Sequence, residues 1–182
     1  GSFQSEAVLR EEAAKHDVGL VMEPALADGS LAIERMGSGQ FKIEVFGRSA
    51  HVGREFERGI SAVVKLGEVL TSLGLMADAK RGLIVNVGPL KGGSATNVVP
   101  DYAAVWGNVR YRDEAGGEEL GAMIDALATE GESLPQVVVH RHWNRPAKPI
   151  NDAVRALAER AQRTATDLGQ QLLLVGTGIA AG

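Results

Sequence analysis

Hydrophobic and polar residues in the middle of this sequence follow two different periods. Segments in which every second residue is apolar predict half-buried strands, and segments with apolar residues three or four positions apart predict amphipathic helices. Strands are expected at 41–47, 82–93, 98–112 and 135–143, and helices at 57–73 and 118–131. The resulting β-α-β-β-α-β order is that of a ferredoxin-like unit, in which a four-stranded antiparallel sheet carries two helices on one face.

The first of these helices has its apolar residues at helical spacing. They are Ile60, Val63, Val64, Gly67 and Leu70. This stripe is the face that the pattern assigns to the core.

Both ends of the chain combine helices with short apolar runs. Helices are expected at 5–16 and 152–169, and short strands at 18–22 and 171–175, with one more inside 27–40. Gly37 to Gly39 has the composition of a hinge or linker. We therefore predict a mixed fold, α/β plus α+β: residues 1–37 and 147–182 form parts of an incomplete α/β domain, and residues 38–146 form an inserted ferredoxin-like domain.

Composition excludes several classes of partner and site. The 182 residues are 45% hydrophobic and 23% charged, with a net charge of -4, so no basic surplus is present to neutralise nucleic-acid phosphates. The absence of cysteine rules out disulfides and thiolate metal sites and fits a reducing compartment, which leads us to expect a cytoplasmic protein. No apolar run reaches the roughly 18 residues that a membrane span requires.

Two candidate residues lie where a strand gives way to another element. Glu23 follows the run 18–22 and is held by Pro24, so it is either a metal ligand at a strand end or a surface glutamate in a turn. His51 stands in GRSAHVG, residues 47–53, between an expected strand and an expected helix. Nothing near it in sequence is a chemical partner for its imidazole.

Two further candidates occur around the strand at 98–112. Asn97, in GGSATNVVPD, is either a substrate-binding amide or an asparagine in a β-turn. Arg110 is either a two-pronged ligand for a carboxylate or a solvent-facing arginine. It shares one face of the strand with Tyr102, Ala104, Trp106, Asn108 and Arg112.

His140 and His142 are two residues apart and therefore share one face of a strand. Such a pair is compatible with metal binding. No third ligand of suitable type lies nearby in sequence, which favours two solvent-facing histidines.

The order of the motifs gives more information than any motif alone. MEPA, GRSAHVG, RGISAV and NVGPLKGGSATNVVPDYAAVWGNVRYR occur in this order. This series resembles the zinc-dependent exopeptidase and deacylase family of carboxypeptidase G, acetylornithine deacetylase and succinyl-diaminopimelate desuccinylase. The resemblance covers most of the chain.

The resemblance implies a catalytic α/β domain with two zinc ions and an inserted ferredoxin-like lid that forms a homodimer. It implies that Glu23 is a zinc ligand and that His51 reaches the partner's active site to stabilise the oxyanion. Asn97 and Arg110 would hold the substrate's carboxylate and neighbouring polar atoms. The implied reaction is hydrolysis of an N-acyl amino acid or peptide conjugate, with release of glutamate or a similar amino acid.

Most metal ligands of that family have no counterpart in this chain, and Glu23 is the one that remains. A catalytic zinc needs about three protein ligands. We therefore expect the polypeptide as it stands to be inactive and to be part of a longer enzyme. The alternative is a noncatalytic ferredoxin-like module for dimerisation or ligand binding.

Overall fold

The computed structural model describes residues 3–21 and 26–177. The chain forms α1 (Phe3–Ala13), β1 (Leu31–Arg35), β2 (Gly37–Phe46), α2 (Val52–Glu55), the 3₁₀ helix η1 (Phe56–Arg58), α3 (Ala62–Leu75), β3 (Leu83–Gly92), β4 (Tyr102–Tyr111), α4 (Glu114–Asp125), β5 (Gln136–Arg145), α5 (Asp152–Asp167) and β6 (Leu174–Thr177).

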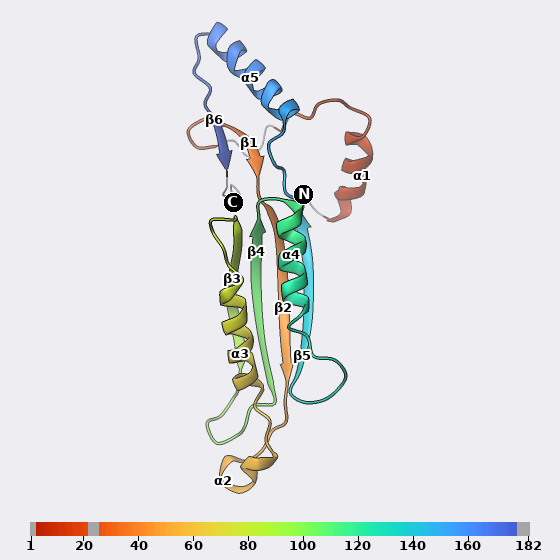
Figure 1. Ribbon diagram of the computed structural model, residues 1–182, viewed down its shortest axis with the longest axis vertical. Helices are drawn as coiled ribbons and strands as arrows, with labels where there is room; N and C mark the ends of the chain where they lie inside the picture. The colour runs from red at the N-terminus through yellow and green to blue at the C-terminus, as the bar shows by residue number, and fades with distance from the viewer. Residues whose placement is uncertain (1–2, 22–25, 178–182) are drawn as a thin grey trace.

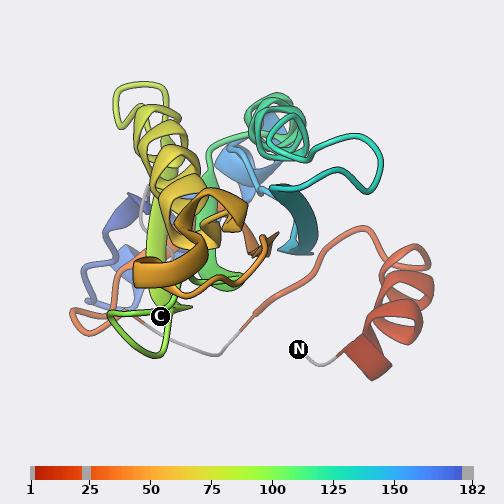
Figure 2. The same cartoon turned by 90° about the horizontal axis from the view of Figure 1, so that it is seen from below.

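A four-stranded antiparallel sheet forms the centre of the molecule. Its strand order is β3-β4-β2-β5. Helices α3 and α4 cover one face, as the view from the α2 end shows (Figure 2). Because β2, α3, β3, β4, α4 and β5 follow one another in the chain, the predicted ferredoxin-like arrangement is confirmed.

The core lies between this sheet and its two helices. Alternate residues of each strand point to the helices, so apolar residues two apart are buried together. The fully buried side chains of the core include Ile43, Val45, Leu73, Val105, Val109, Tyr111, Leu120, Ile124 and Val137.

Helix α3 buries a different stripe from the one that its spacing predicted. Ala62, Leu66, Val69 and Leu73 are buried, whereas Val63 and Val64 are 40% and 67% exposed. The helix begins at Ala62 because the Ser61 hydroxyl accepts a hydrogen bond from the Val64 N–H at 3.2 Å. Of the predicted stripe, Leu70 is partly buried against this core, so the spacing was right for a helix but wrong for most of its buried face.

Gly37 and Gly39 do not form a hinge; both are buried at the start of β2. A Cβ at Gly37 would lie 2.0 Å from Cε2 of Tyr111, and one at Gly39 would lie 2.1 Å from Cε3 of Trp143. Each ring lies over the glycine directly opposite it on a neighbouring strand. These glycines therefore make room for aromatic side chains.

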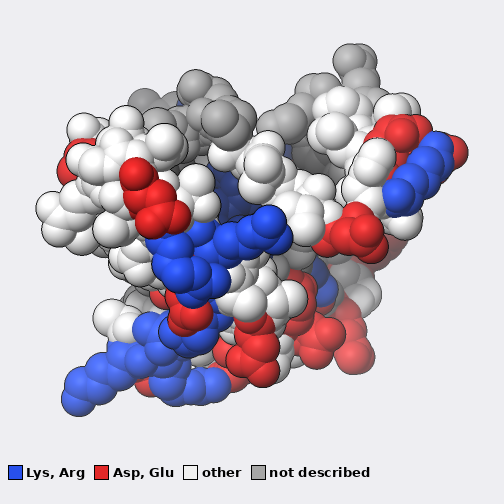
Figure 3. All heavy atoms as spheres, turned by 90° about the horizontal axis from the view of Figure 1, so that it is seen from above, with Lys and Arg blue, Asp and Glu red and all other residues white. Residues whose placement is uncertain are grey.

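The chain passes twice between this sheet and a smaller unit. There β1 and β6 form a parallel pair, with α5 beside them (Figure 1). At the passage, Arg35 and Lys148 exchange both backbone hydrogen bonds, at 2.9 and 2.8 Å. We call this double connection the neck. Viewed from the end of the molecule that carries α5, the surface shows both acidic and basic side chains (Figure 3).

The apolar run at 18–22 is not a buried strand in its described part, residues 18–21. Val18, Leu20 and Val21 are 52%, 76% and 84% exposed, and no strand includes them. Leu20 and Val21 line a hollow together with residues of β1, but the run does not join the sheet of β1 and β6. The prediction was wrong because an apolar composition does not by itself make the backbone pair with a strand.

Candidate functional site

His51 lies at the end of the sheet farthest from the neck, at the start of α2 (Figure 1). Its backbone is extended, with φ -76° and ψ 120°, and its Nδ1 accepts a hydrogen bond from the Gly53 N–H at 3.1 Å. A neutral imidazole that accepts through Nδ1 carries its proton on Nε2. The exposed ring can therefore donate a hydrogen bond from Nε2.

Asn97 belongs to the loop that pairs with the His51 segment. Its carbonyl oxygen accepts from the Val52 N–H at 3.0 Å, and the Val99 N–H donates to the Ala50 carbonyl at 2.9 Å. His51 and Val98 form an isolated antiparallel bridge. Two candidates that are far apart in sequence, His51 and Asn97, are thus held on adjacent backbones at one end of the molecule.

Gly47 fixes how the His51 segment leaves β2. A Cβ there would lie 2.1 Å from the Ile60 carbonyl oxygen, and the Arg48 and Ile60 backbones exchange hydrogen bonds at 2.9 Å. The first glycine of the quoted GRSAHVG motif is therefore required by a close backbone approach. This approach orients the loop that carries His51.

The surface around His51 has features that the sequence did not reveal. Phe56 and Val52 are 61% and 43% exposed. The Arg48 Nε donates to the Arg58 carbonyl at 2.8 Å, which ties the two ends of the protruding segment together. Two exposed apolar side chains therefore lie in the short helical segment that follows His51.

Arg110 lies at the opposite end of β4, close to the neck. It pairs in register with Ser38 of β2 and Ile84 of β3. Its Nη1 donates to the Asn108 side-chain oxygen at 2.6 Å and to the Val109 carbonyl at 3.3 Å. These bonds use only Nη1, and within residues 3–21 and 26–177 no group accepts from Nε or Nη2, so that edge remains for a carboxylate.

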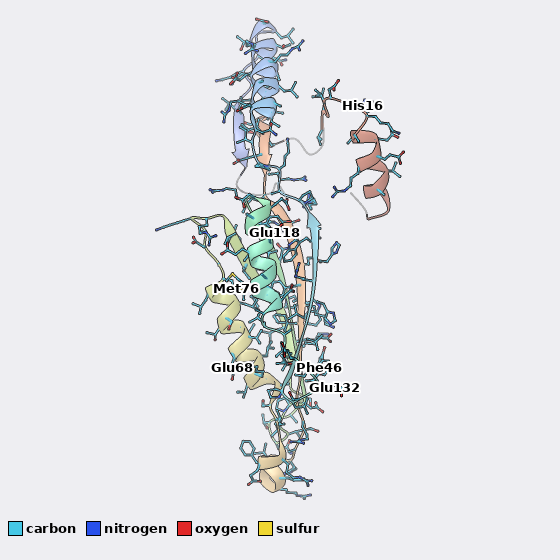
Figure 4. All side chains as sticks on the ribbon, turned by 45° about the vertical axis from the view of Figure 1, so that its right-hand side comes forward. His16, Phe46, Glu68, Met76, Glu118 and Glu132 are labelled. Atoms are coloured by element: carbon cyan, nitrogen blue, oxygen red, sulfur yellow. The ribbon has the colours of Figure 1, made fainter. Side chains whose placement is uncertain are left out.

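The structure does not bring Arg110 together with His51 and Asn97. The part of β4 from Tyr102 to Arg110 alone spans about 27 Å, at the usual rise of about 3.4 Å per residue. His51 lies beyond the Tyr102 end of that strand. The side-chain view gives the same direction: Phe46, at the end of β2, lies toward α2, and Glu118 of α4 lies toward the neck (Figure 4).

A polar cluster occupies the sheet face that has no helices. Glu44 contacts Lys42 Nζ at 2.7 Å, the Tyr102 hydroxyl at 2.7 Å and His140 Nε2 at 3.1 Å. Hydrogen bonds from Lys42 and then from Tyr102 hold the pKa of the Glu44 carboxyl below its ordinary value. The same contact with Glu44 raises the pKa of Lys42.

The described residues contain no group of three histidine, aspartate or glutamate side chains that could hold a metal ion. His140 and His142 are both exposed, as the sequence predicted. Glu23, the predicted zinc ligand, lies outside the described residues.

The family model described as "Peptidase dimerisation domain" (M20_dimer) matches residues 33–133, more than half of the chain. The chain belongs to the M20 peptidase dimerisation-domain family. The resemblance seen in the ordered motifs is thereby confirmed. The match begins within β1 and ends between α4 and β5, so it includes the His51 and Asn97 loops as well as Arg110.

Two curated relatives of this M20 chain match most of its length. Carboxypeptidase G2 of Pseudomonas sp. (strain RS-16) is 28% identical over 168 residues, 88% of this chain and 39% of the relative. N-acetyl-L-cysteine deacetylase of Bacillus subtilis (strain 168) is 22% identical over 158 residues, 81% of this chain and 38% of the relative. The chain therefore spans about two fifths of the length of these relatives.

Solved structures agree with the fold. Aminopeptidase PepT from Bacillus cereus ATCC 10987 aligns with a TM-score of 0.67 and 22% identity, over 84% of this chain and 41% of that one. A tripeptidase from Staphylococcus aureus aligns with a TM-score of 0.63 and 25% identity, over 81% of this chain and 39% of that one.

Among the residues that the structure describes, no helix has the length and apolarity of a membrane span.

Proposed function

We propose that this M20 chain is the lid-bearing part of a zinc-dependent metallohydrolase. The enzyme would cleave the amide bond of an N-acyl amino acid or peptide conjugate and release glutamate or a similar amino acid. The family match and the relatives named as a carboxypeptidase and a deacetylase support this reaction class. The domain limits at residues 38 and 146 and a cytoplasmic location remain predictions.

The observation that best supports this proposal is the distance between Arg110 and His51. Arg110 lies beside the neck, whereas His51 and Asn97 lie past the other end of β4, about 27 Å or more away. A small acyl amino acid cannot touch both ends of one sheet. Shared binding of one substrate therefore requires Arg110 from one subunit and His51 from another, which favours a homodimer with composite sites.

In each composite site, the residues of this chain would bind and polarise the substrate. The free Nε and Nη2 edge of Arg110 would hold the substrate carboxylate in a two-pronged contact. The Nε2–H of His51 would donate to the carbonyl oxygen as negative charge develops on it, with Asn97 beside it for a neighbouring polar atom. The hydrogen bond from Gly53 to Nδ1 keeps the proton on the donating nitrogen.

The zinc ions implied by the family do not fit the described residues, because no suitable cluster of ligands is present among them. Their ligands would belong to the longer protein, with Glu23 as this chain's contribution. We therefore derive no step through the metal.

Subunit mixing in the full-length protein tests the composite site. His51→Ala is expected to lower kcat by about 100-fold, the scale for loss of an oxyanion donor, and Arg110→Ala to raise KM. At a substrate concentration far below the KM of Arg110→Ala, both variants are nearly inactive. Equal mixing of the two, with subunit exchange, should then restore about one quarter of the wild-type activity, because half of the dimers regain one intact site. If His51 and Arg110 serve a site in the same subunit, mixing restores nothing.

A reciprocal control uses a chain that carries both substitutions, mixed equally with the wild type. Composite sites leave about one quarter of the activity, since every mixed dimer is inactive, whereas sites within one subunit leave about one half. If full-length wild-type protein hydrolysed no N-acyl amino acid at all, the noncatalytic dimerisation module would replace the enzyme.

A further inference from the structure

Trp106 stands on the helix-free face of the sheet, between strands β2 and β3. On β2 its register partner is Lys42. On β3 the register shifts between Val87 and Leu90, so Gly88 and Pro89 form a bulge there. Gly88 has no side chain, so at the bulge itself no side chain of β3 covers the indole, and Lys91 further along β3 approaches it instead.

The bulge leaves a hollow next to the indole. It has a volume of about 440 Å³, within the range of small-molecule sites. A Cβ placed at Gly88 would contact nothing within 4 Å, and the positive φ of 138° keeps the position open by disfavouring any larger residue. The hollow is lined by Gln40, Phe41, Gly88, Pro89, Lys91, Trp106, Gly107 and Asn108.

Two ammonium groups approach the same ring. Lys42 Nζ lies 5.6 Å and Lys91 Nζ 5.9 Å from the Trp106 ring centroid. Lys42 is paired with Glu44 at 2.7 Å. Lys91 is exposed and has no ion pair with any residue that the structure describes. The rim of the hollow therefore carries one positive charge that no described carboxylate balances.

From this geometry we propose that the hollow binds a small planar aromatic carboxylate. Its ring stacks on the indole of Trp106, and its carboxylate pairs with Lys91, the lysine that lines the hollow. Gln40 and Asn108 supply amide groups at the edge of the ligand. The ligand needs an aromatic ring to stack on the flat indole. It needs one negative charge to balance Lys91. This site does not depend on hydrolytic activity or on the role of His51. It adjoins Arg110, whose Nη1 donates to the Asn108 side-chain oxygen at 2.6 Å.

The two tryptophans allow a direct test by nuclear magnetic resonance. In the uniformly ¹⁵N-labelled 182-residue chain, their two indole N–H signals are assigned with Trp106→Phe. Trp143 is an internal reference, because its Nε1 donates to the Gly117 carbonyl at 3.2 Å on the helix-covered side. The probes are 2-naphthoate, the neutral 2-naphthylmethanol and the non-aromatic cyclohexanecarboxylate.

The Trp106 signal should move saturably with 2-naphthoate while the Trp143 signal stays still. The other two probes should bind at least about tenfold more weakly, since each lacks one of the two contacts. Lys91→Gln should weaken binding of 2-naphthoate by about fivefold, the scale for an exposed charge pair. Lys65→Gln, on helix α3 of the opposite face, should leave it unchanged.

Three results overturn the proposal. They are a Trp106 signal that does not saturate, equal affinity for the neutral aromatic probe, and an unchanged affinity in Lys91→Gln. Because Lys91 is exposed, its substitution does not threaten folding, so each of these results refers to binding itself.

Discussion

Gly107 of β4 is a position at which one added methyl group should be costly. A Cβ there would lie 2.0 Å from Cζ of Phe41, 2.5 Å from its Cε1 and 2.6 Å from the backbone oxygen of Asn86. Phe41 is only 3% exposed, so its ring cannot move into solvent. The Asn86 oxygen belongs to strand β3, so it can move only if the strand pairing shifts.

Gly107→Ala should therefore destabilise the protein by about 3 kcal/mol, the upper part of the range for overpacked cores. For a chain of this size, the loss corresponds to a decrease in Tm of about 10 °C. The measurement is urea unfolding followed by circular dichroism, with the slope of the transition compared between variants to verify a common unfolded state.

Two further variants separate packing from other effects. Gly67→Ala, on the exposed side of α3 with nothing within 4 Å of the new Cβ, should stabilise the protein by about 0.5–1 kcal/mol. Phe41→Leu in the Gly107→Ala background should recover stability relative to the sum of the single effects. If Gly107→Ala unfolded within about 0.5 kcal/mol of the wild type, or if Phe41→Leu gave no recovery, the contact would not determine the cost.

Two smaller effects should be measurable with the same unfolding assay. Because the pKa of Glu44 is lowered, its stabilising contribution is complete at neutral pH and is lost as the pH falls below the ordinary value of about 4.5. The wild type should therefore be more stable than Glu44→Gln at neutral pH, and this difference should shrink on acidification. A difference that stays constant with pH would contradict this. Asp113→Ala should lower the free energy of unfolding by about 1 kcal/mol, because the carboxylate caps α4 by accepting from the Gly116 N–H at 2.8 Å. Asp113→Asn keeps the cap and should leave the stability nearly unchanged. Equal losses of stability in the two variants would rule out capping.

The sheet was predictable because burial on one face leaves a two-residue period in the sequence. In β2 this period places Phe41, Ile43 and Val45 on the helix side and Lys42 and Glu44 on the other. A local pattern was sufficient there. The same reasoning failed for residues 18–21, since a strand also needs a partner that the local pattern does not contain.

The meaning of the glycines could not be obtained locally. Gly37 and Gly39 have the composition of a linker, but the rings of Tyr111 and Trp143, far along the chain, occupy the space above them. Only the strand register brings these residues together. Register is a long-range property, and no window around the glycines encodes it.

The candidate site was partly predictable. The resemblance singled out His51, Asn97 and Arg110, and antiparallel strands bring the end of β2 and the start of β4 to the same end of the sheet. The distance to Arg110 then follows from the length of β4. The hydrogen bond that fixes the His51 tautomer depends on the backbone turn at Gly53, and the sequence pattern does not predict this turn.

The neck has an evolutionary consequence. Two residues that exchange both hydrogen bonds in an antiparallel pair have their Cα atoms about 5.5 Å apart, so the chain leaves the smaller unit at Arg35 and returns to it at Lys148 almost where it left. A gene segment that encodes everything between them could be gained, exchanged or removed without changing the path of the chain on either side. The ferredoxin-like sheet could therefore diversify independently of the protein that carries it.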